Sequence, residues 1–426
     1  MSFIIETRDL GHFDLIVAGG GLAGCFAAAS AAREGGRVLL AESSGVLGGT
    51  LATGFVPSIM DEVGKGGMLG ELFTFLNEHG MTVARFGKKV DENGKKIPGR
   101  IVDVEGCKYF LDQLLRQAGV TVSFFTRVAG CEMDGRNIKR LLLASEAGNY
   151  EASAKYYIDA TGNGNLAALA GCRFEWGEPG TGRLSPATSG FSVVGFPDEY
   201  DGTNSAKEKR EYSDMLKAHD IHISTEEAGI VRLPAMKLWD MSIDYQYNVL
   251  PDNIQVMSEA AMNSRQEIFE AIEKHRRIPG YENLWVAQTA EHLGMREGRR
   301  VFGKYRISER DMIEGQHHED GICLVQTNVD LHKIHPTDTL NASRGFRTVP
   351  YEIPFRALIP LDADNLLLAG RCLSGDFYPH ASYRMIGNMA ATGEAAGFAA
   401  IYALQHSCTP EEVPSSILRQ RMKEYL

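Results

Sequence analysis

The sequence predicts an α/β fold with a parallel sheet, and a second, smaller α+β domain inserted into it. Three observations carry this prediction: a strand, turn, helix and strand between Asp14 and Glu42, a length of 426 residues that is too great for one core, and a return to buried strand and helix patterns after a central block of different composition. We expect residues 1–175 and 326–426 to form the main domain and residues 176–325 the inserted domain.

The first unit has the order and spacing of a dinucleotide-binding βαβ motif. An apolar strand at 14–18 runs into the glycine turn 19–24, an alanine-rich helix and a second strand that ends at Glu42. In such a turn Gly19 permits the tight bend, Gly21 lets the backbone approach a pyrophosphate, and Gly24 lets the helix lie close to the strand. The helix N-terminus then offers N–H groups to the phosphates.

Glu42 stands where the ribose hydroxyls of a dinucleotide would lie. Its carboxylate can accept from both hydroxyls and would repel a 2′-phosphate. A glycine segment follows, with Gly48, Gly49 and Thr50, that suits neither a helix nor a strand interior.

The rest of the N-terminal segment alternates between helix and strand patterns. We expect helices within 64–80 and 103–118, a surface hairpin or loop at 85–100 with an Asn93-Gly94 turn, and strands at 120–125, 138–146 and 154–159. The last strand runs into Ala160-Thr161-Gly162, where the backbone is expected to pass close to a cofactor.

The central block differs in composition and contains no second glycine fingerprint. Tryptophans and tyrosines stand among prolines and glycines over 176–250, and residues 253–278 read as a helix that buries Ile268, Phe269 and Ile272. After this block, 365–371 reads as a buried strand, and a small-residue helix at 391–404 is expected to lie very close to a strand or another flat partner.

Composition excludes several classes. The net charge of −11 disfavours nucleic-acid binding. The sequence contains no run of about 18 apolar residues, so no membrane span is indicated. The N-terminus lacks a signal-peptide pattern, and we therefore expect a cytoplasmic protein. Seven scattered cysteines favour neither disulfides nor a zinc site. Cys372 is kept open because it follows a motif described next.

In these motifs the chain resembles the FAD-dependent oxidoreductases of the glutathione-reductase superfamily. The resemblance rests on the glycine turn, Gly48-Gly49, Ala160-Thr161-Gly162, Arg296-Glu-Gly-Arg-Arg300 and Ala369-Gly-Arg-Cys372, in that order. It implies FAD as cofactor, bound by a Rossmann-like domain that is discontinuous in sequence, with a substrate or cap domain between its parts. One departure is that Asn163 and Asn165 stand where the family usually has aspartates.

The resemblance also implies which residues bind FAD. Those for the pyrophosphate, ribose and adenine are Gly19, Gly21, Ala23, Gly24, Glu42, Ser43, Gly48, Gly49, Thr50, Val128, Ala160, Thr161 and Gly162; those for the ribityl phosphate and the flavin pyrimidine are Gly370, Arg371, Gly387, Asn388 and Met389. Val128 would meet the adenine through its backbone. A helix N-terminus at Gly387 would stabilise the negative charge of a reduced flavin.

Oxidation of an alcohol or amine by a flavin also needs a base that titrates near neutrality. His380, just before the helix expected to face the flavin, is the first candidate and His335 the second. Arg384 and Arg296 are candidates for binding a carboxylate or polarising a substrate oxygen. Glu297 with Arg299 and Arg300 favours an internal ion-pair network, and the pattern of His317, His318, His332 and His335 does not favour a metal site.

We therefore expect an FAD-dependent dehydrogenase or oxidase that takes hydride from a small polar metabolite, such as a sugar, a hydroxy compound or an amine. Because no second dinucleotide fingerprint is present, its electrons would pass to an external acceptor. The alternative is a flavin-dependent reductase of carbon–carbon double bonds, of the fumarate- or prenyl-reductase kind. A flavin-containing RNA-modification protein is disfavoured by the negative charge.

Overall fold

The computed structural model describes residues 6–426 except 91–95, 204, 235 and 339–347. Its N-terminal segment contains β1 (Arg8–Ala18), α1 (Leu22–Arg33), β2 (Val38–Ala41), η1 (Gly49–Leu51), β3 (Ser58–Ile59), α2 (Gly67–Glu78), β4 (Thr82–Val90), β5 (Lys96–Val102), α3 (Val104–Ala118), β6 (Thr121–Ser123), β7 (Thr126–Asp134), β8 (Asn137–Ser145), β9 (Gly148–Asp159) and α4 (Asn165–Leu169). The C-terminal segment contains β17 (Tyr351–Pro354), η2 (Phe355–Leu358), β18 (Leu366–Leu368), α8 (Phe377–Tyr383), α9 (Ile386–His406), η3 (Pro410–Glu412), α10 (Ser415–Arg421) and η4 (Lys423–Tyr425).

The main sheet joins both ends of the chain. Within the described residues its strand order is β6-β2-β1-β9-β8-β7, with β18 also beside β9. Strands β6, β2, β1, β9 and β18 run parallel to their neighbours, whereas β7 and β8 form an antiparallel extension. The predicted α/β fold with a discontinuous, parallel sheet is confirmed.

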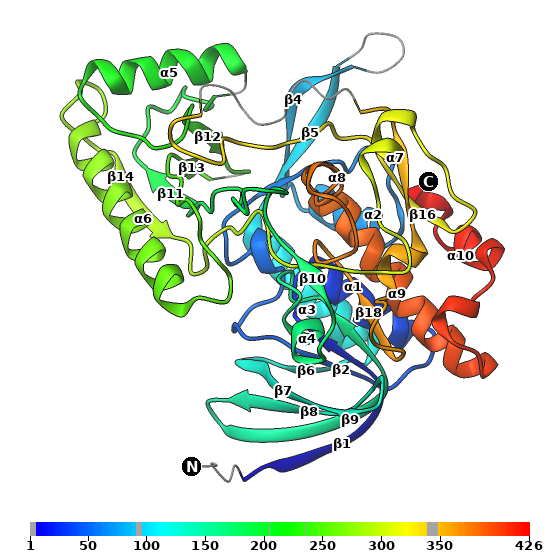
Figure 1. Cartoon of the computed structure of the whole chain (residues 1–426). Helices are drawn as coiled ribbons and strands as arrows, with labels where there is room; N and C mark the ends of the chain where they lie inside the picture. Colours follow the sequence, from blue (N-terminus) through cyan, green and yellow to red (C-terminus); the bar gives the residue numbers. More distant parts are fainter. Residues whose placement is uncertain (1–5, 91–95, 204, 235, 339–347) are drawn as a thin grey trace.

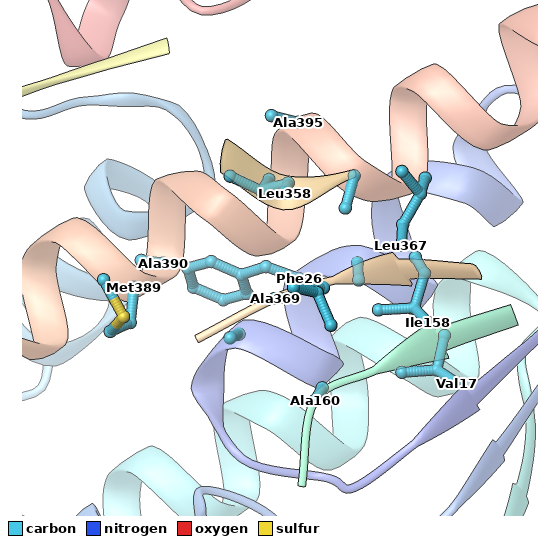
Figure 2. Packing of buried hydrophobic residues seen from close by; sticks show 14 of the residues in the cluster. Val17, Phe26, Ile158, Ala160, Leu358, Leu367, Ala369, Met389, Ala390 and Ala395 are labelled. Carbon is cyan, nitrogen blue, oxygen red and sulfur yellow. The ribbon is translucent and has the colours of Figure 1, made fainter. Parts of the chain in front are cut away.

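Helices α1 and α9 pack face to face above this sheet (Figures 1 and 2). A Cβ on Gly393 would lie 2.0 Å from the Ala23 carbonyl oxygen, and one on Gly397 would lie 2.1 Å from that of Ala27. Figure 2 shows Phe26 of α1 in one cluster with Ala390 of α9 and Ala369, which follows β18. The flat partner of the small-residue helix is therefore another small-residue helix, and α9 begins at Ile386, earlier than predicted.

The middle of the chain forms a second core beside the first. This stretch of the chain, of which only a part belongs to the second core, contains β10 (Phe174–Glu175), β11 (Phe191–Val194), α5 (Ala206–Ala218), β12 (Gly229–Arg232), β13 (Trp239–Ser242), α6 (Ile254–His275), β14 (Trp285–Thr289), β15 (Arg300–Val301), α7 (Glu309–Glu314) and β16 (Gly321–Val325). The antiparallel sheet β12-β13-β11-β14 packs against α5 and α6, on the left of Figure 1. Its core is built around Phe191, Trp239 and Ile268.

The chain returns to the first core before residue 326, where the boundary was predicted. Val301, Ile307 and Ile322 belong to the main hydrophobic cluster, and β16 pairs with β17. The division into domains itself stays a prediction.

Two local predictions differ from the structure. Phe269 was expected inward but is 53% exposed, because α6 buries the neighbouring face that carries Ile268 and Ile272. The strand predicted at 120–125 ends at Ser123, since Phe125 takes φ 52° in the turn to β7. The predicted hairpin is confirmed as β4 and β5, while its Asn93-Gly94 turn lies outside the described residues.

Candidate functional site

The glycine turn after β1 has the geometry that its sequence predicts. Gly19 takes φ +100°, and a Cβ there would lie 2.6 Å from the Ala160 carbonyl oxygen. A Cβ on Gly24 would lie 1.9 Å from the Gly19 carbonyl oxygen. Larger residues at either position would therefore separate α1 from the ends of β1 and β9.

Glu42 holds the turn from the end of β2. Its carboxylate accepts the Gly20 N–H at 2.6 Å through Oε2 and the Ser44 N–H at 2.7 Å through Oε1. The Ser43 hydroxyl also donates to Oε1, at 3.1 Å. Each carboxylate oxygen can accept more than one hydrogen bond, so the geometry leaves acceptor capacity for a ribose.

The second glycine segment lies against the first. Gly48 donates to the Gly20 carbonyl at 2.8 Å, and Gly21 pairs with Gly48 in an isolated parallel bridge. A Cβ on Gly49 would lie 2.9 Å from the Gly21 Cα, so only a residue without a side chain permits this approach. The first turn of α1 has no acidic residue, and its N-cap makes no side-chain bond. This N-terminus is a backbone cradle that fits a diphosphate.

The Ala160-Thr161-Gly162 segment lies at the carboxyl end of β9, next to that turn. Buried Asp159 accepts from the Thr161 N–H and hydroxyl at 3.0 and 2.7 Å, which fixes the bend. A Cβ on Gly162 would lie 2.8 Å from Nη1 of Arg371. The backbones of two motifs far apart in sequence thus meet at one edge of the sheet.

Arg371 donates through Nη2 to the Asn163 side-chain oxygen at 2.7 Å, and its buried Nε has no hydrogen-bond partner among the described residues. Burial lowers the pKa of this guanidinium. Arg299 donates to the Asn165 side-chain oxygen at 3.0 Å. The two asparagines that replace the expected aspartates therefore act as neutral acceptors for arginines.

A second group of polar residues lies where the inserted sheet meets the start of α9. The His292 N–H donates to the Thr53 carbonyl at 3.1 Å, which places the end of β14 beside the segment after Gly49. Arg384, between α8 and α9, donates to the Asp330 carbonyl at 2.7 Å and to the Arg296 carbonyl. We call this group, formed by Arg296, Arg384, Asp330, His332, Tyr245 and Glu226, the junction cluster.

Arg296 is partly exposed in the junction cluster. Its Nη1 donates to the Pro186 carbonyl at 2.8 Å and to the Thr188 hydroxyl, and its guanidinium lies 5.3 Å from the centre of the Tyr245 ring. The edge formed by Nε and Nη2 makes no hydrogen bond to any described residue. That edge has two parallel N–H groups, the arrangement that binds a carboxylate in bidentate fashion.

Arg384 is more fully engaged. Burial, reinforced by Arg296 and opposed by Asp330, lowers its pKa to about 10, so it stays protonated at neutral pH. Its hydrogen bonds go to main-chain carbonyls of other segments, and its Nη2 also lies 3.9 Å from Oδ2 of Asp330. Its evident role is to hold Arg296 and Asp330 near the corner between α8 and α9.

Comparisons with known proteins agree with this geometry. Residues 14–422 match the family of FAD dependent oxidoreductases. The chain belongs to that family. FAD is therefore its cofactor, and the turn, Glu42 and the Gly21–Gly49 cradle fit the phosphates and ribose of that cofactor.

Solved structures share the fold of this FAD-dependent oxidoreductase at low identity. A geranylgeranyl bacteriochlorophyll reductase-like protein from Thermoplasma acidophilum is 13% identical with a TM-score of 0.52, covering 98% of this chain and 84% of that one. A p-nitrophenol 4-monooxygenase from Pseudomonas putida is 14% identical with a TM-score of 0.53, covering 98% and 86%. A flavin-dependent brominase is 12% identical with a TM-score of 0.52, covering 96% and 83%. These likenesses concern the fold alone, and they include a reductase-like protein, a monooxygenase and a halogenase. The assignment to the glutathione-reductase superfamily stays a prediction.

The start of α9 differs in detail from what the resemblance implied. The Gly387 N–H donates to the Met60 carbonyl at 3.0 Å, and those of Asn388 and Met389 donate to the Met385 carbonyl. A flavin at this corner would meet amides that already have acceptors. Val128 lies inside β7, paired with Leu143, rather than at a strand end. The Gly370 N–H donates to the Thr392 hydroxyl at 2.9 Å.

His380, the first candidate base, lies in α8 and is 2% exposed. Burial, with the charges of Arg384, Arg300 and Arg371, lowers its pKa well below the usual value, and its Nε2 has no hydrogen-bond partner among the described residues. It is neutral at pH 7 and its surroundings oppose an imidazolium. His335 instead faces a local turn, where its Nδ1 lies 2.7 Å from the Thr337 hydroxyl.

The predicted ion pair of Glu297 is confirmed for Arg300, whereas Arg299 donates to Asn163 and Asn165 instead. The Glu297 carboxylate pairs with Arg300 and accepts the Gly177 and Ser185 N–H groups at 2.8 and 3.1 Å. Cys372 is buried, and its thiol lies 3.5 Å from the carbonyl oxygens of Asp159 and Ala369. Burial raises its pKa well above the usual value, so it stays a thiol. Glu297 also interacts electrostatically with Arg384 of the junction cluster.

Sequence reasoning missed most of the junction cluster. Tyr245, Glu226 and Asp330 were not candidates, and His332 was weighed only as part of a histidine group for metal. No group of three or more metal-ligating residues is present in the described parts of the chain. Likewise, none of the helices described is long and apolar enough to cross a membrane.

Proposed function

We propose that this FAD-dependent oxidoreductase oxidises a small polar metabolite that carries a carboxylate or a similar oxyanion. The substrate would be a hydroxy or amino acid or an acidic sugar, bound at the junction cluster. The Nε–Nη2 edge of Arg296 carries this proposal, because a half-buried guanidinium edge that makes no hydrogen bond to a described residue can bind a carboxylate through two parallel N–H groups.

FAD supplies the acceptor for the hydride of the oxidised carbon. The protein has three tasks around it: Arg296 binds the anionic group, Arg384 holds Arg296 and Asp330 in place, and a nearby base takes the proton of the substrate hydroxyl or amine. The electrons then pass to an external acceptor. His380 and His335 remain candidates for the base; their surroundings favour neither, since arginines oppose a charged His380 and His335 faces away into a turn.

The test is anaerobic mixing of the purified holoenzyme with hydroxy acids, amino acids, acidic sugars and their neutral analogues. We expect the visible absorption band of the flavin to bleach with one anionic class. Arg296→Gln should raise the Kd of that compound about 10- to 100-fold, since a charge-assisted bidentate contact contributes about 1.5–3 kcal/mol. Lys237→Gln, on an exposed lysine of the inserted domain, is the matched control.

Other results would overturn the proposal. If only neutral sugars bleach the flavin, and if they do so equally in Arg296→Gln, the substrate does not need an anionic group. If no compound bleaches the flavin but chemically reduced enzyme is reoxidised by an enoate, the reductase alternative holds. An enzyme that acts on its substrate only with oxygen present would belong with the monooxygenases that share its fold.

A further inference from the structure

We propose that His332 is the base of the reaction, acting through Nε2 and held by Tyr245. This deepens the proposed function and rests on it. His332 lies on the segment that returns from the inserted domain, two residues after Asp330, whose carbonyl Arg384 fixes at 2.7 Å. The histidine is therefore tied to the corner that precedes α9.

The two ring nitrogens of His332 have different neighbours. The Tyr245 hydroxyl lies 2.6 Å from Nδ1 and 3.4 Å from Oε2 of Glu226. Burial raises the pKa of Tyr245 far above its usual value, so it keeps its proton. We assign the Tyr245 proton to Glu226; Nδ1 then carries a proton and donates to the tyrosine oxygen, which leaves Nε2 as the acceptor. The His332 side chain is 25% exposed.

Two carboxylates flank the ring and would stabilise the imidazolium. Nε2 lies 3.7 Å from Oδ1 of Asp330, and Nδ1 lies 3.9 Å from Oε2 of Glu226. Burial raises the pKa of each carboxyl, but the neighbouring donors and positive groups together outweigh it: His332, Arg384 and Arg296 at Asp330, and His332 and Lys333 at Glu226. The net pKa of each is lowered, so both are carboxylates at neutral pH.

His380 has the opposite surroundings. Three arginines lie near it, and the charge of a protonated ring would add to theirs. At His332 the arginines are balanced by Asp330 and Glu226. The charge distribution therefore assigns proton acceptance to His332 rather than to His380.

The step balances as follows for an alcohol. The substrate hydroxyl would give its proton to Nε2 of neutral His332, and the hydrogen of the adjacent carbon would leave as hydride, with two electrons, for which bound FAD would be the acceptor. The alcohol would become a carbonyl compound, and the imidazolium would pair with Asp330.

The first experiment reads the histidine without any substrate. We expect ¹⁵N NMR of histidine-labelled holoenzyme to show the ring of His332 protonated at Nδ1, and Tyr245→Phe to shift that signal. The signal of His332 is assigned as the one that is absent from the spectrum of His332→Gln. The control is His222→Gln, which changes an exposed histidine of the inserted domain. A ring protonated at Nε2 with Nδ1 bare would overturn the proposal, whatever the substrate.

The second experiment measures anaerobic flavin reduction by the compound found active. His332→Ala should slow it about 100- to 1,000-fold with little change in substrate Kd, and added imidazole should restore part of the rate. His332→Gln retains more of the side-chain packing than His332→Ala does. If wild-type flavin is reduced and both variants reduce it at the wild-type rate, this inference fails while the proposed function stands. If wild-type flavin is not reduced by the panel, the proposed function fails, and the NMR result still decides the state of the ring.

Discussion

At the scale of single residues, one side chain can both stabilise the fold and be available to bind a ligand. Glu42 fastens the glycine turn through Gly20 and Ser44 and keeps lone pairs for a ribose. Its position could be predicted because a local pattern, an acid at the end of the second strand, specifies it, while its binding of the ribose stays a prediction. His332 and Tyr245 lie 87 positions apart, and no local spacing relates them. Only the fold brings them together.

A residue whose environment makes a direct prediction about stability is His275 in α6. It is 1% exposed, and its Nε2 lies 3.0 Å from the Tyr212 hydroxyl. Burial, reinforced by nearby His219, lowers its pKa from 6.5 to about 4. The unfolded chain takes up a proton near pH 6.5, whereas the folded chain does so only near pH 4.

The stabilisation from neutral His275 is therefore complete above pH 6.5 and is lost as the pH falls toward 4. The shift corresponds to about 3 kcal/mol of unfolding free energy. We expect urea unfolding of His275→Gln to show a flatter dependence on pH between 6.5 and 4 than the wild type. His222→Gln should retain the wild-type slope, and equal slopes for wild type and His275→Gln would contradict the burial of a neutral ring.

At the scale of elements, the contact between α1 and α9 decides the architecture around the cofactor. Both helices are rich in alanine and glycine, and Figure 2 shows how closely they pack above the sheet. The sequence predicted that the helix near the C-terminus lies close to a partner. Small residues indicate close approach but carry no information about what approaches, so the sequence left the partner open between a strand and another flat partner.

Two glycine substitutions distinguish the effect of close helix packing on stability from the effect of helix propensity. Gly397→Ala would place a Cβ 2.1 Å from the Ala27 carbonyl, so we expect a loss of at least about 2 kcal/mol in unfolding free energy. Gly70→Ala in α2 meets nothing within 4 Å, and we expect a gain of about 0.5–1 kcal/mol from helix propensity. Denaturant unfolding measures both. A neutral Gly397→Ala would show that α1 and α9 are further apart than described.

At the scale of the whole molecule, the cofactor site is assembled from segments distant in sequence. The turn at Gly19, the Ala160 segment and Arg371 meet at one sheet edge, while the inserted sheet brings Arg296 and Tyr245 beside the start of α9. The glycine motifs and the α/β class could be predicted since each is encoded locally. The junction cluster depends on how two cores are oriented, which no local pattern encodes.

The account rests most directly on FAD bound at the Gly19 turn and Glu42. The measurement that tests this is the thermal unfolding of apoprotein with increasing FAD, for wild type, Glu42→Gln and the exposed control Glu78→Gln. We predict stabilisation by about 2.7 kcal/mol at an FAD concentration of about 100 Kd, and a Kd about 10-fold higher for Glu42→Gln alone. A midpoint that does not respond to FAD, or one that responds equally in Glu42→Gln, would contradict the placement of the cofactor.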